Sequence, residues 1–370
     1  MGDGPASREG PGRRAPATGG AMTADVSLVL VTFRSSAVAP VAAASFRAEA
    51  RRCGLEAEII VVDHSEDGEE AARLRELEPR RLLLQANRGY AAGVNAGVRA
   101  STAPTVMVGN PDISFSEGSV EALLRTLDGG FDVVGPQFAL GRFLFPPADR
   151  QTPGEHLRRV AAGLWSAAWT RRLNVELRRW RGVWEATSPV AVPALAGALL
   201  GFRRKTFDLV GPWDEGYFLY FEETDWLRRA ASRGLRPALV PAARVEHLWG
   251  HAADPEACAA AFARSRARFV ATHFGWGGRL ASRLPLRTAP VEPQPLPGPD
   301  RLPSGVRWWL LSPSPLGLPA AGFLGTAADL RPALAAVSAA RQGRGRYLVL
   351  AADPGGSRPV AAWRWEASDG

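Results

Sequence analysis

The sequence predicts an α/β fold whose central sheet is mainly parallel. Three continuous apolar runs rich in β-branched residues, at residues 26–33, 57–63 and 105–109, are typical of strands buried on both faces. Helical patterns separate these runs, and strands that alternate with helices form parallel βαβ units. We therefore expect a layered sheet flanked by helices, with a ligand site beyond the carboxyl ends of its strands.

The composition of the 370-residue chain is that of a folded protein with one large domain or two modest ones. The net charge of +8 is carried mostly by arginine. That bias suits an anionic membrane surface, a phosphorylated substrate or nucleic acid. Cys53 and Cys258 match no metal or redox spacing, so we expect reduced thiols and a cytoplasmic protein.

Residues 1–24 are rich in glycine, proline and arginine, without an apolar core. They predict a disordered tail rather than a signal peptide, and either Met1 or Met22 fits as the start. No stretch has the apolar length that a membrane-spanning helix requires. We expect the main domain to occupy residues 25–280.

Polar residues follow the three predicted strands where each strand ends. They are Thr32, Asp63 and the pair Asn110 and Asp112. Each alone is more often a turn residue than a ligand. Because the ends of parallel strands meet at one edge of a sheet, their joint placement favours a binding crevice.

The segment Asn87–Gly97 places a glycine at every fourth position of a predicted helix. Interior glycine costs a helix about 1 kcal/mol relative to alanine. One interpretation is that Gly89 and its neighbours let the backbone approach a ligand, with Asn87 and Asn95 offering amide hydrogen bonds. The other is close packing of the helix on the sheet, and both can hold.

Residues 153–182 form a predicted helical insertion rich in tryptophan, leucine and arginine, with the helix itself over Pro153–Trp180. It is either a packed helix with solvated arginines or a basic amphipathic surface for anionic lipid. The second interpretation uses two sets of side chains. The apolar set is Leu157, Leu164, Trp165, Trp169 and Leu173, and the basic set is Arg158, Arg159, Arg171, Arg172, Arg178 and Arg179.

Three carboxylates, Glu222, Glu223 and Asp225, open a predicted helix directly after an aromatic stretch. Acidic residues favour helix N-termini, but this explains one or two of them better than three. Carboxylates beside apolar surface have raised proton affinity, which suits a general base. His247 follows two short predicted strands downstream, where it is a plausible metal ligand.

The C-terminal part is predicted to be separate from the main domain. Residues 281–304 are crowded with proline and predict a semi-rigid linker. Residues 305–370 suggest a small α/β module, in which we find no chemistry.

Five sequence blocks, in order, resemble glycosyltransferase family 2, especially its bacterial rhamnosyltransferase-like members. The blocks are "VTFRS", "EIIVVDHSEDG", "NRGYAAGVNAG", "VGNPDI" and "GPWDEGYFLYFEETD" with a following "VEHLWG". The resemblance covers Val26 to about Phe274. It implies a GT-A fold, a Rossmann-like nucleotide-sugar-binding sheet flanked by helices.

The resemblance also implies roles for single residues. Thr32 and Asp63 lie where the family holds the base and ribose of the nucleotide. Asn110 and Asp112 replace its metal-binding Asp-x-Asp, so Asp112 would carry the metal contact, with His247 completing the site. The donor-binding set is Thr32, Asp63, Asn87, Gly89, Asn95, Asn110 and Asp112.

The catalytic and acceptor-side residues are implied in the same way. Glu222 and Glu223 match a Glu-Asp pair whose second member is usually the base. Here glutamate replaces that aspartate. Trp213, Asp214 and Asp225 would lie on the acceptor side.

The activity implied is inverting transfer of a sugar, with dTDP-rhamnose the favoured donor and Mg²⁺ or Mn²⁺ the cofactor. The implied acceptor is a glycan or lipid-linked glycan, with an anionic membrane surface as a further partner and no nucleic acid. We expect a cytoplasmic enzyme, peripheral at the inner face of the plasma membrane. A nucleotidyltransferase-like enzyme and a non-catalytic sugar- or lipid-binding relative remain alternatives.

Overall fold

The computed structural model describes residues 24–248, 255–286, 288–290, 292–340, 345–355 and 359–367. The predicted tail lies outside these residues, apart from Ala24. The strands are β1 Val26–Thr32, β2 Ala57–Asp63, β3 Arg81–Leu84, β4 Thr105–Gly109, β5 Ile113–Phe115, β6 Val133–Leu140, β7 Phe143–Leu144, β8 Val190–Ala191, β9 Leu199–Arg203, β10 Pro237–His247, β11 Gln294–Pro295, β12 Arg307–Ser312, β13 Ala321–Gly325, β14 Arg346–Ala352 and β15 Pro359–Glu366. The α-helices are α1 Ala39–Arg52, α2 Gly68–Arg75, α3 Tyr90–Ala100, α4 Ser119–Asp128, α5 Pro153–Ala162, α6 Ser166–Trp184, α7 Arg204–Val210, α8 Glu222–Ser232, α9 Pro255–Ser282 and α10 Ala327–Ala340.

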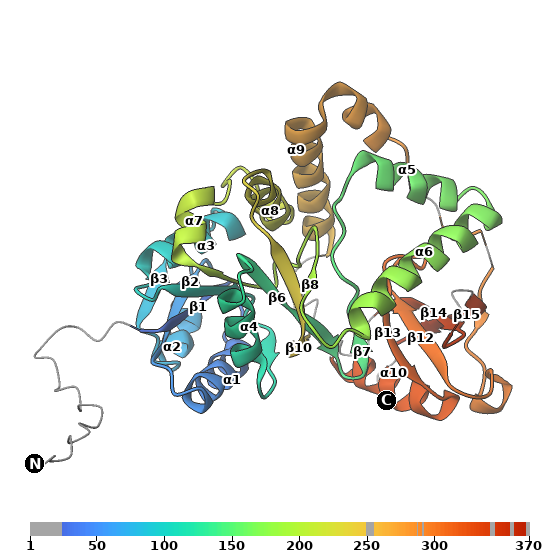
Figure 1. The fold of residues 1–370 in the computed structure, drawn as a ribbon, viewed down its shortest axis with the longest axis horizontal. Helices are drawn as coiled ribbons and strands as arrows, with labels where there is room; N and C mark the ends of the chain where they lie inside the picture. The colour runs from blue at the N-terminus through green and yellow to red at the C-terminus, as the bar shows by residue number, and fades with distance from the viewer. Residues whose placement is uncertain are drawn as a thin grey trace, which may run out of the picture.

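The strands join into a single sheet that runs across the molecule (Figure 1). Its order along the main path is β11-β15-β14-β12-β13-β7-β6-β9-β4-β1-β2-β3, with β10 pairing β5, β6 and β8 beside it. The pairs β1–β2, β1–β4 and β2–β3 are parallel, as we predict, whereas β9 lies antiparallel between β4 and β6. The sheet is therefore mixed, with a parallel part that brings the ends of β1, β2 and β4 to one edge.

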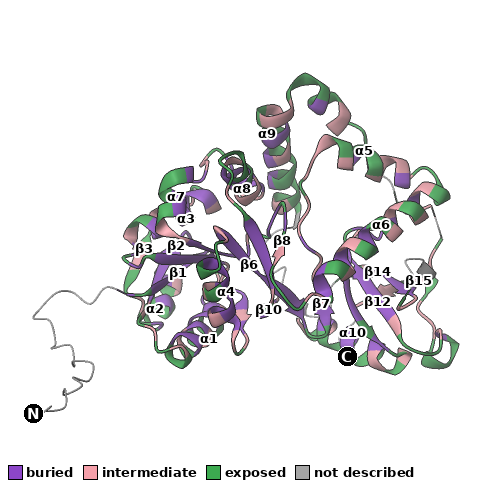
Figure 2. Cartoon of the chain, viewed as in Figure 1, coloured by how far each residue is buried: buried purple, intermediate pink, exposed green. Residues whose placement is uncertain are grey.

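Side chains of β1 alternate between two apolar cores. Leu28 and Leu30 pack with α1, α2 and α4 on one face, and Val29 and Val31 pack with α3, α7 and α8 on the other. This two-residue period is that of a strand buried on both sides. Figure 2 shows the strands as the buried centre of the molecule.

The C-terminal module is continuous with the main domain. Gly322 on β13 pairs with Leu144 on β7, and β7 is the short partner of β6, so β12–β15 extend the same sheet. The predicted linker contributes to this extension, because Gln294 on β11 pairs with Trp363 on β15. Strands β12 and β14 bury their own two faces under α6 and α10.

The predicted helix Pro153–Trp180 is two helices, α5 and α6, which separate at residues 163–165. The expectation of a lipid-facing apolar surface is wrong for Trp169 and Leu173, which lie under 5% exposed against β12 and β14. The apolar face of α6 therefore covers the C-terminal strands. Leu157, Leu164 and Trp165 remain exposed.

Half of the six arginines belong to a buried ion network. Arg159 and Arg179 both pair with Asp149, and Arg172 pairs with Glu176 at 2.5 Å. Arg159 and Arg179 thus hold α5 and α6 to the chain that precedes them, whereas Arg172 pairs within α6. Arg158, Arg171 and Arg178 are exposed.

The two short strands expected before His247 are one strand, β10. Its register against β6 shifts between Val240 and Arg244, where a bulge interrupts the pairing. The bulge lies where the sequence reads "PAA", and proline cannot donate to a ladder of hydrogen bonds.

Candidate active site

The ends of β1 and β2 form a buried hydrogen-bonded pair. Thr32 Oγ1 donates to Asp63 Oδ1 at 2.8 Å, and both residues are at most 2% exposed. Ser65 Oγ donates to the same carboxylate oxygen at 2.7 Å and accepts from the backbone N–H of Arg34. Thr32 and Asp63 thus lie together as predicted, and Ser65, which we did not single out, fixes the Asp63 carboxylate.

The glycines of α3 allow close packing on β1. A Cβ at Gly93 would lie 2.6 Å from a methyl of Val31, and a Cβ at Gly97 would lie 2.2 Å from a methyl of Val29. Both distances are far shorter than ordinary contacts between carbon atoms. The packing interpretation of these two glycines is therefore confirmed.

Gly89 has a different reason to be glycine. Its φ is +93°, and a Cβ there would lie 2.4 Å from the carbonyl oxygen of Phe218. Tyr90 donates its backbone N–H to that same oxygen at 2.8 Å. Gly89 therefore lets the chain just before α8 lie directly on the start of α3.

Asn95 occupies a supporting position at 1% exposure. Its Nδ2 donates to the Trp213 carbonyl at 2.9 Å and to Glu215 Oε1 at 3.1 Å, and its Oδ1 accepts from the Trp213 N–H at 2.9 Å. Asn87 Oδ1 accepts from the Gly89 N–H at 3.1 Å. In the structure both amides bind backbone that shapes the site.

The carboxylates at the start of α8 follow a backbone turn of unusual conformation. Tyr220 and Phe221 have φ values of +69° and +71°, in the left-handed region that non-glycine residues rarely adopt. Such residues cost on the order of 1–3 kcal/mol each and cluster at functional sites. The turn directs the chain so that Glu222 and Glu223 begin the helix.

The two glutamates have raised pKa values. Burial, and secondly the charge of Glu223, raise the pKa of Glu222 well above its ordinary value; Glu222 is 4% exposed, and its Oε2 has no hydrogen-bond partner among the described residues. Burial also raises the pKa of Glu223, although Thr224 Oγ1 donates to it at 3.1 Å. Glu223 is the more accessible of the two and packs against Gly197.

Asp112 and His247 meet across the antiparallel pair β5–β10. Asp112 Oδ1 lies 3.3 Å from His247 Nε2, and both residues are 9% exposed. The imidazole packs against the rings of Phe138 and Phe145. Asn110 ties the end of β4 to β9, because its N–H donates to the Ala198 carbonyl at 3.0 Å.

A carboxylate and an imidazole at this separation suit a divalent cation. Within the part of the chain that the structure describes, no group of three or more His, Cys, Asp or Glu side chains could hold a metal. The pair therefore fits a metal whose other ligands come from outside the protein, such as phosphate oxygens and water.

Tyr90 lies near both Asp112 and the glutamates Glu222 and Glu223. Its hydroxyl donates to the Gly197 carbonyl at 3.3 Å. Burial raises its pKa most, and the charges of Glu222, Glu223 and Asp112 raise it further, so all three carboxylates lie near enough to act on one phenol. We did not predict Tyr90, although it stands within the glycine block that carries the resemblance.

The acceptor-side residues lie behind the glutamates. Trp213 is 1% exposed and packs on Trp226 in the core. Asp225, at 3% exposure, accepts from Arg229 Nε at 2.8 Å and lies 2.7 Å from His273 Nε2. Asp225 therefore ties α8 to α9, a connection between distant segments that the sequence does not reveal.

Asp214 lies at the surface of this region. It pairs with Arg268 of α9 at 2.7 Å, and hydrogen bonds from Arg268 and the Gly216 N–H lower its pKa despite partial burial. Helix α9 thus contacts both the loop before the turn at Tyr220 and Phe221 and the helix α8 after it.

The chain is similar in sequence to known glycosyltransferases. Residues 27–161 match the model of the family "Glycosyl transferase family 2". Over 247 residues the chain is 31% identical to an N-acetylglucosaminyl-diphospho-decaprenol L-rhamnosyltransferase in two strains of Mycobacterium tuberculosis, which covers 62% of this chain and 78% of each relative.

Two solved structures are more distant. GalNAc-T7, in a crystal structure with UDP, GalNAc and Mn²⁺, is 16% identical with a TM-score of 0.45, and the match covers 61% of this chain and 44% of that one. The mannosyltransferase PcManGT from Pyrobaculum calidifontis, in complex with GDP-Man and Mn²⁺, is 15% identical with a TM-score of 0.41, covering 61% and 57%.

The predicted α/β fold class is confirmed, because the mixed sheet is flanked by helices. The match to the mycobacterial enzymes extends over most of their length. The chain belongs to glycosyl transferase family 2, and it is a glycosyltransferase.

Proposed function

We propose that this glycosyltransferase moves rhamnose from dTDP-rhamnose to a lipid-linked glycan, with inversion at the anomeric carbon. The observation that carries the proposal is the cluster of Glu222, Glu223 and Asp112 around Tyr90. Near this tyrosine, Glu222 and Glu223 supply a candidate base and Asp112 a candidate diphosphate site, while Thr32 and Asp63 supply candidate nucleoside contacts at the ends of β1 and β2. The 31% identity to rhamnosyltransferases supports the choice of sugar and of a lipid-linked acceptor.

Glu223 is the proposed general base. The acceptor oxygen attacks the anomeric carbon, its proton passes to the Glu223 carboxylate, and the bond to the nucleoside diphosphate breaks with its electron pair on the leaving oxygen. Burial raises the pKa of Glu223, so it takes a proton more readily than an exposed glutamate. The buried Glu222 beside it is easily protonated, and Glu223 can then carry the negative charge alone.

Thr32 and Asp63 are the proposed nucleoside contacts. Ser65 donates to the Asp63 carboxylate and accepts from the Arg34 N–H, which fixes the carboxylate at the end of β2. Asn87, Gly89 and Asn110 lie on the loops that border this edge, where they would contact the rest of the donor. Asn95 acts on the donor only through the loop it holds.

Asp112 and His247 would hold Mg²⁺ or Mn²⁺. A bound cation would neutralise charge on the departing diphosphate. Excess chelator should therefore stop transfer, and Asp112→Ala should weaken cation-dependent donor binding, measured by calorimetry with and without Mn²⁺. His247→Ala should give a milder defect, and full transfer in chelator would remove the metal from the proposal.

We also propose a cytoplasmic protein that attaches peripherally to the membrane. No helix in the described residues is long and apolar enough to cross a bilayer. The exposed Trp165 stands beside Leu164, near the exposed arginines Arg158 and Arg171. Each basic residue near an anionic surface contributes about 1 kcal/mol. The protein should co-sediment with anionic vesicles and not with neutral ones, and equal binding to both would contradict the attachment.

Transfer of labelled sugar tests the function. Purified protein with dTDP-rhamnose and a diphosphate-lipid-linked N-acetylglucosamine should form a product that contains rhamnose. Glu223→Gln keeps the shape of the side chain and removes its basicity, so the rate should fall by about 10²–10⁴-fold with donor affinity unchanged. Near-normal transfer by Glu223→Gln, with Glu222→Gln inactive, would assign the base to Glu222.

A further inference from the structure

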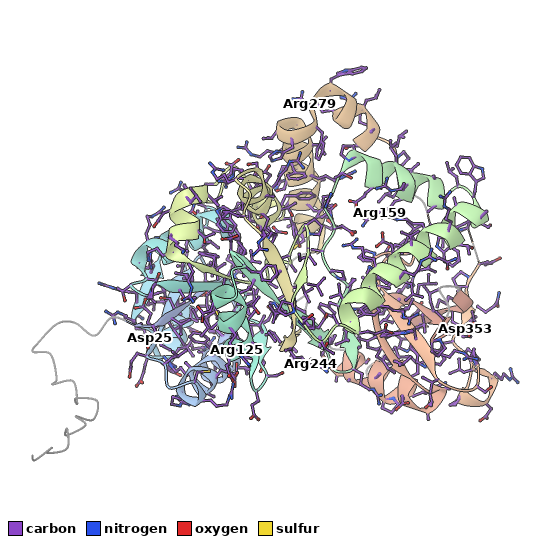
Figure 3. The ribbon with its side chains drawn as sticks, in the orientation of Figure 1. Asp25, Arg125, Arg159, Arg244, Arg279 and Asp353 are labelled. Atoms are coloured by element: carbon purple, nitrogen blue, oxygen red, sulfur yellow. The ribbon has the colours of Figure 1, made fainter. Side chains whose placement is uncertain are left out.

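A small cavity lies between α5 and α9, outside the donor edge of the sheet. Its volume is about 70 Å³, several times the ~10–15 Å³ that one ordered water needs. It is lined by Thr152, Glu155 and Arg159 from the α5 side and by Phe262, Arg266 and Leu286 from the α9 side. Figure 3 shows Arg159 on the inner side of α5, between α9 and α6.

The cavity holds two guanidinium groups with unused hydrogen-bond donors. Arg159 pairs with Asp149, but its buried Nε has no partner among the described residues. Arg266 has one recorded contact, a long hydrogen bond of 3.5 Å to the Ser282 carbonyl, and no carboxylate within ion-pair distance in the described part of the chain. Burial and the positive charge of Arg159 lower the pKa of Arg266, so the two guanidinium groups lie near enough to repel each other.

The other two titratable groups that line the cavity, Glu155 and His156, have hydrogen-bond partners of their own. The Glu155 carboxylate accepts from the Thr152 N–H at 3.3 Å, as part of the capping box of α5. His156 Nε2 lies 2.8 Å from the Leu284 carbonyl, and burial lowers the pKa of His156. The donors of Arg159 and Arg266 therefore remain available for an anion such as phosphate.

The α9 wall of the cavity packs against the turn formed by Tyr220 and Phe221. The ring of Phe262 lies 5.6 Å from that of Tyr220 and 5.2 Å from that of Phe221. Phe221 directly precedes Glu222, so a single aromatic layer separates the cavity from the catalytic helix. An anion bound here would thus lie on the α9 side of Glu222 and Glu223. Neither Thr32 nor Asp63 lines this cavity.

One exposed leucine, Leu286, lines the cavity, and two more lie close to it in the chain. Leu280, Leu284 and Leu286 are 53%, 45% and 51% exposed, along the end of α9 and the chain that leaves it. Figure 2 shows this end of α9 as a largely exposed arm. A cationic cavity beside exposed leucines suits a phosphate that carries a hydrocarbon chain.

We propose that the cavity between α5 and α9 binds the phosphate of the acceptor's lipid diphosphate, and that the exposed leucines contact the lipid chain. This proposal rests on the proposed lipid-linked acceptor. Arg266 is its main phosphate ligand, with Arg159 as the second.

Farnesyl diphosphate tests the site directly in the full chain. Its affinity is measured by calorimetry in chelator, so that a cation-dependent diphosphate site does not contribute. Arg266→Gln should weaken binding by about 10-fold or more, because it removes a charge-assisted hydrogen bond. Arg264→Gln is the matched control, since Arg264 is an exposed arginine on the same helix that does not line the cavity. Equal loss in both variants, or none in either, would overturn the proposal.

Two further ligands identify what the cavity recognises. Farnesol should show no dependence on Arg266, because it lacks the phosphates. Inorganic diphosphate should bind more weakly than farnesyl diphosphate. If it binds equally well with the same dependence on Arg266, the site takes free phosphate and the lipid contact is overturned.

Transfer assays separate this proposal from the proposed function. Arg266→Gln should raise the KM for the lipid-linked acceptor about 10-fold, with hydrolysis of the donor unchanged. If wild-type protein transfers sugar and Arg266→Gln has normal KM and normal farnesyl diphosphate affinity, the cavity proposal fails alone. If wild-type protein transfers nothing to the lipid acceptor while farnesyl diphosphate binding still depends on Arg266, the proposed function fails and the anion site stands.

Discussion

Strands β1, β2 and β4 at one end of the sheet and β12, β14 and β15 at the other are each covered by helices on both faces. The first group ends in buried polar side chains, including Thr32 and Asp63. Among described residues after Ser282, Ser312 is the one buried polar side chain. The C-terminal strands are antiparallel, so their ends alternate between the two edges. Of these two groups of strands, only the parallel one therefore gathers buried polar side chains at its ends.

The largest stability effect should come from the C-terminal half. Trp309 is fully buried, and its Nε1 donates to the Gly325 carbonyl at 3.1 Å. Trp309→Ala should lower the free energy of unfolding by about 3–5 kcal/mol. Trp276→Ala, at a residue 80% exposed, should change it by at most about 0.5 kcal/mol. Denaturant unfolding measures both.

The same variant tests the division of roles between the halves. Transfer per folded molecule should be unchanged in Trp309→Ala, because β12 carries no residue of the site. A folded Trp309→Ala protein with a strongly reduced rate would show that the C-terminal half also shapes the catalytic centre.

Gly89 and Gly211 have nearly the same backbone conformation but different surroundings. Substituting each one therefore distinguishes the effect of backbone strain from that of a steric clash. Gly89 has φ 93° and ψ 169°, and Gly211 has φ 87° and ψ 175°. Alanine should cost about 1–3 kcal/mol of unfolding free energy at either position. Only at Gly89 would the new Cβ meet the Phe218 backbone, since Gly211 has open space around its Cβ direction.

Gly89→Ala should therefore reduce the transfer rate, because it displaces the turn that leads to Glu222, while Gly211→Ala should not. Steady-state rates of the two purified variants, corrected for folded fraction, make the comparison. Equal rates would mean that the approach of this turn to α3 does not matter for chemistry.

Asn95 distinguishes a supporting residue from a ligand in the polar half. Asn95→Ala leaves the Trp213 N–H and carbonyl unpaired in a buried place, which should cost about 1–3 kcal/mol of unfolding free energy. Donor affinity, measured by calorimetry on the folded variant, should stay near the wild-type value. A tenfold loss of donor affinity would instead indicate direct contact with the donor.

The smallest effect is a pH dependence of stability from Glu222. Its pKa is raised in the folded state, so the folded protein binds its proton more tightly than the unfolded chain does. Stability from this group is therefore greatest below the ordinary glutamate pKa and falls as the pH rises toward the raised value. Glu222→Gln cannot titrate, so it does not lose stability in this way as the pH rises.

The gain in unfolding free energy of Glu222→Gln over wild type should thus grow with pH over the range above the ordinary glutamate pKa. Unfolding curves across that range measure it. A gain independent of pH would mean that Glu222 titrates alike in both states.

The sequence by itself determined the local structure of the first half and its polar strand ends. Predicted and observed strands agree at residues 57–63 and 105–109, because continuous runs rich in β-branched residues favour buried strands. The positions of Thr32 and Asp63 followed from the same runs. Each of these properties depends on residues close together in the chain.

Only the tertiary structure decided what covers each apolar face and which distant side chains meet. The stripe of Trp169 and Leu173 identifies an apolar helix face, but packing against β12 and β14, rather than lipid, is a long-range outcome. The charges that act on Tyr90 belong to Asp112, more than twenty positions away in the chain, and to Glu222 and Glu223, more than one hundred and thirty positions away. The spacing of apolar residues in the sequence indicates which side chains are buried. Which residues they pack against depends on how the sheet brings remote segments together.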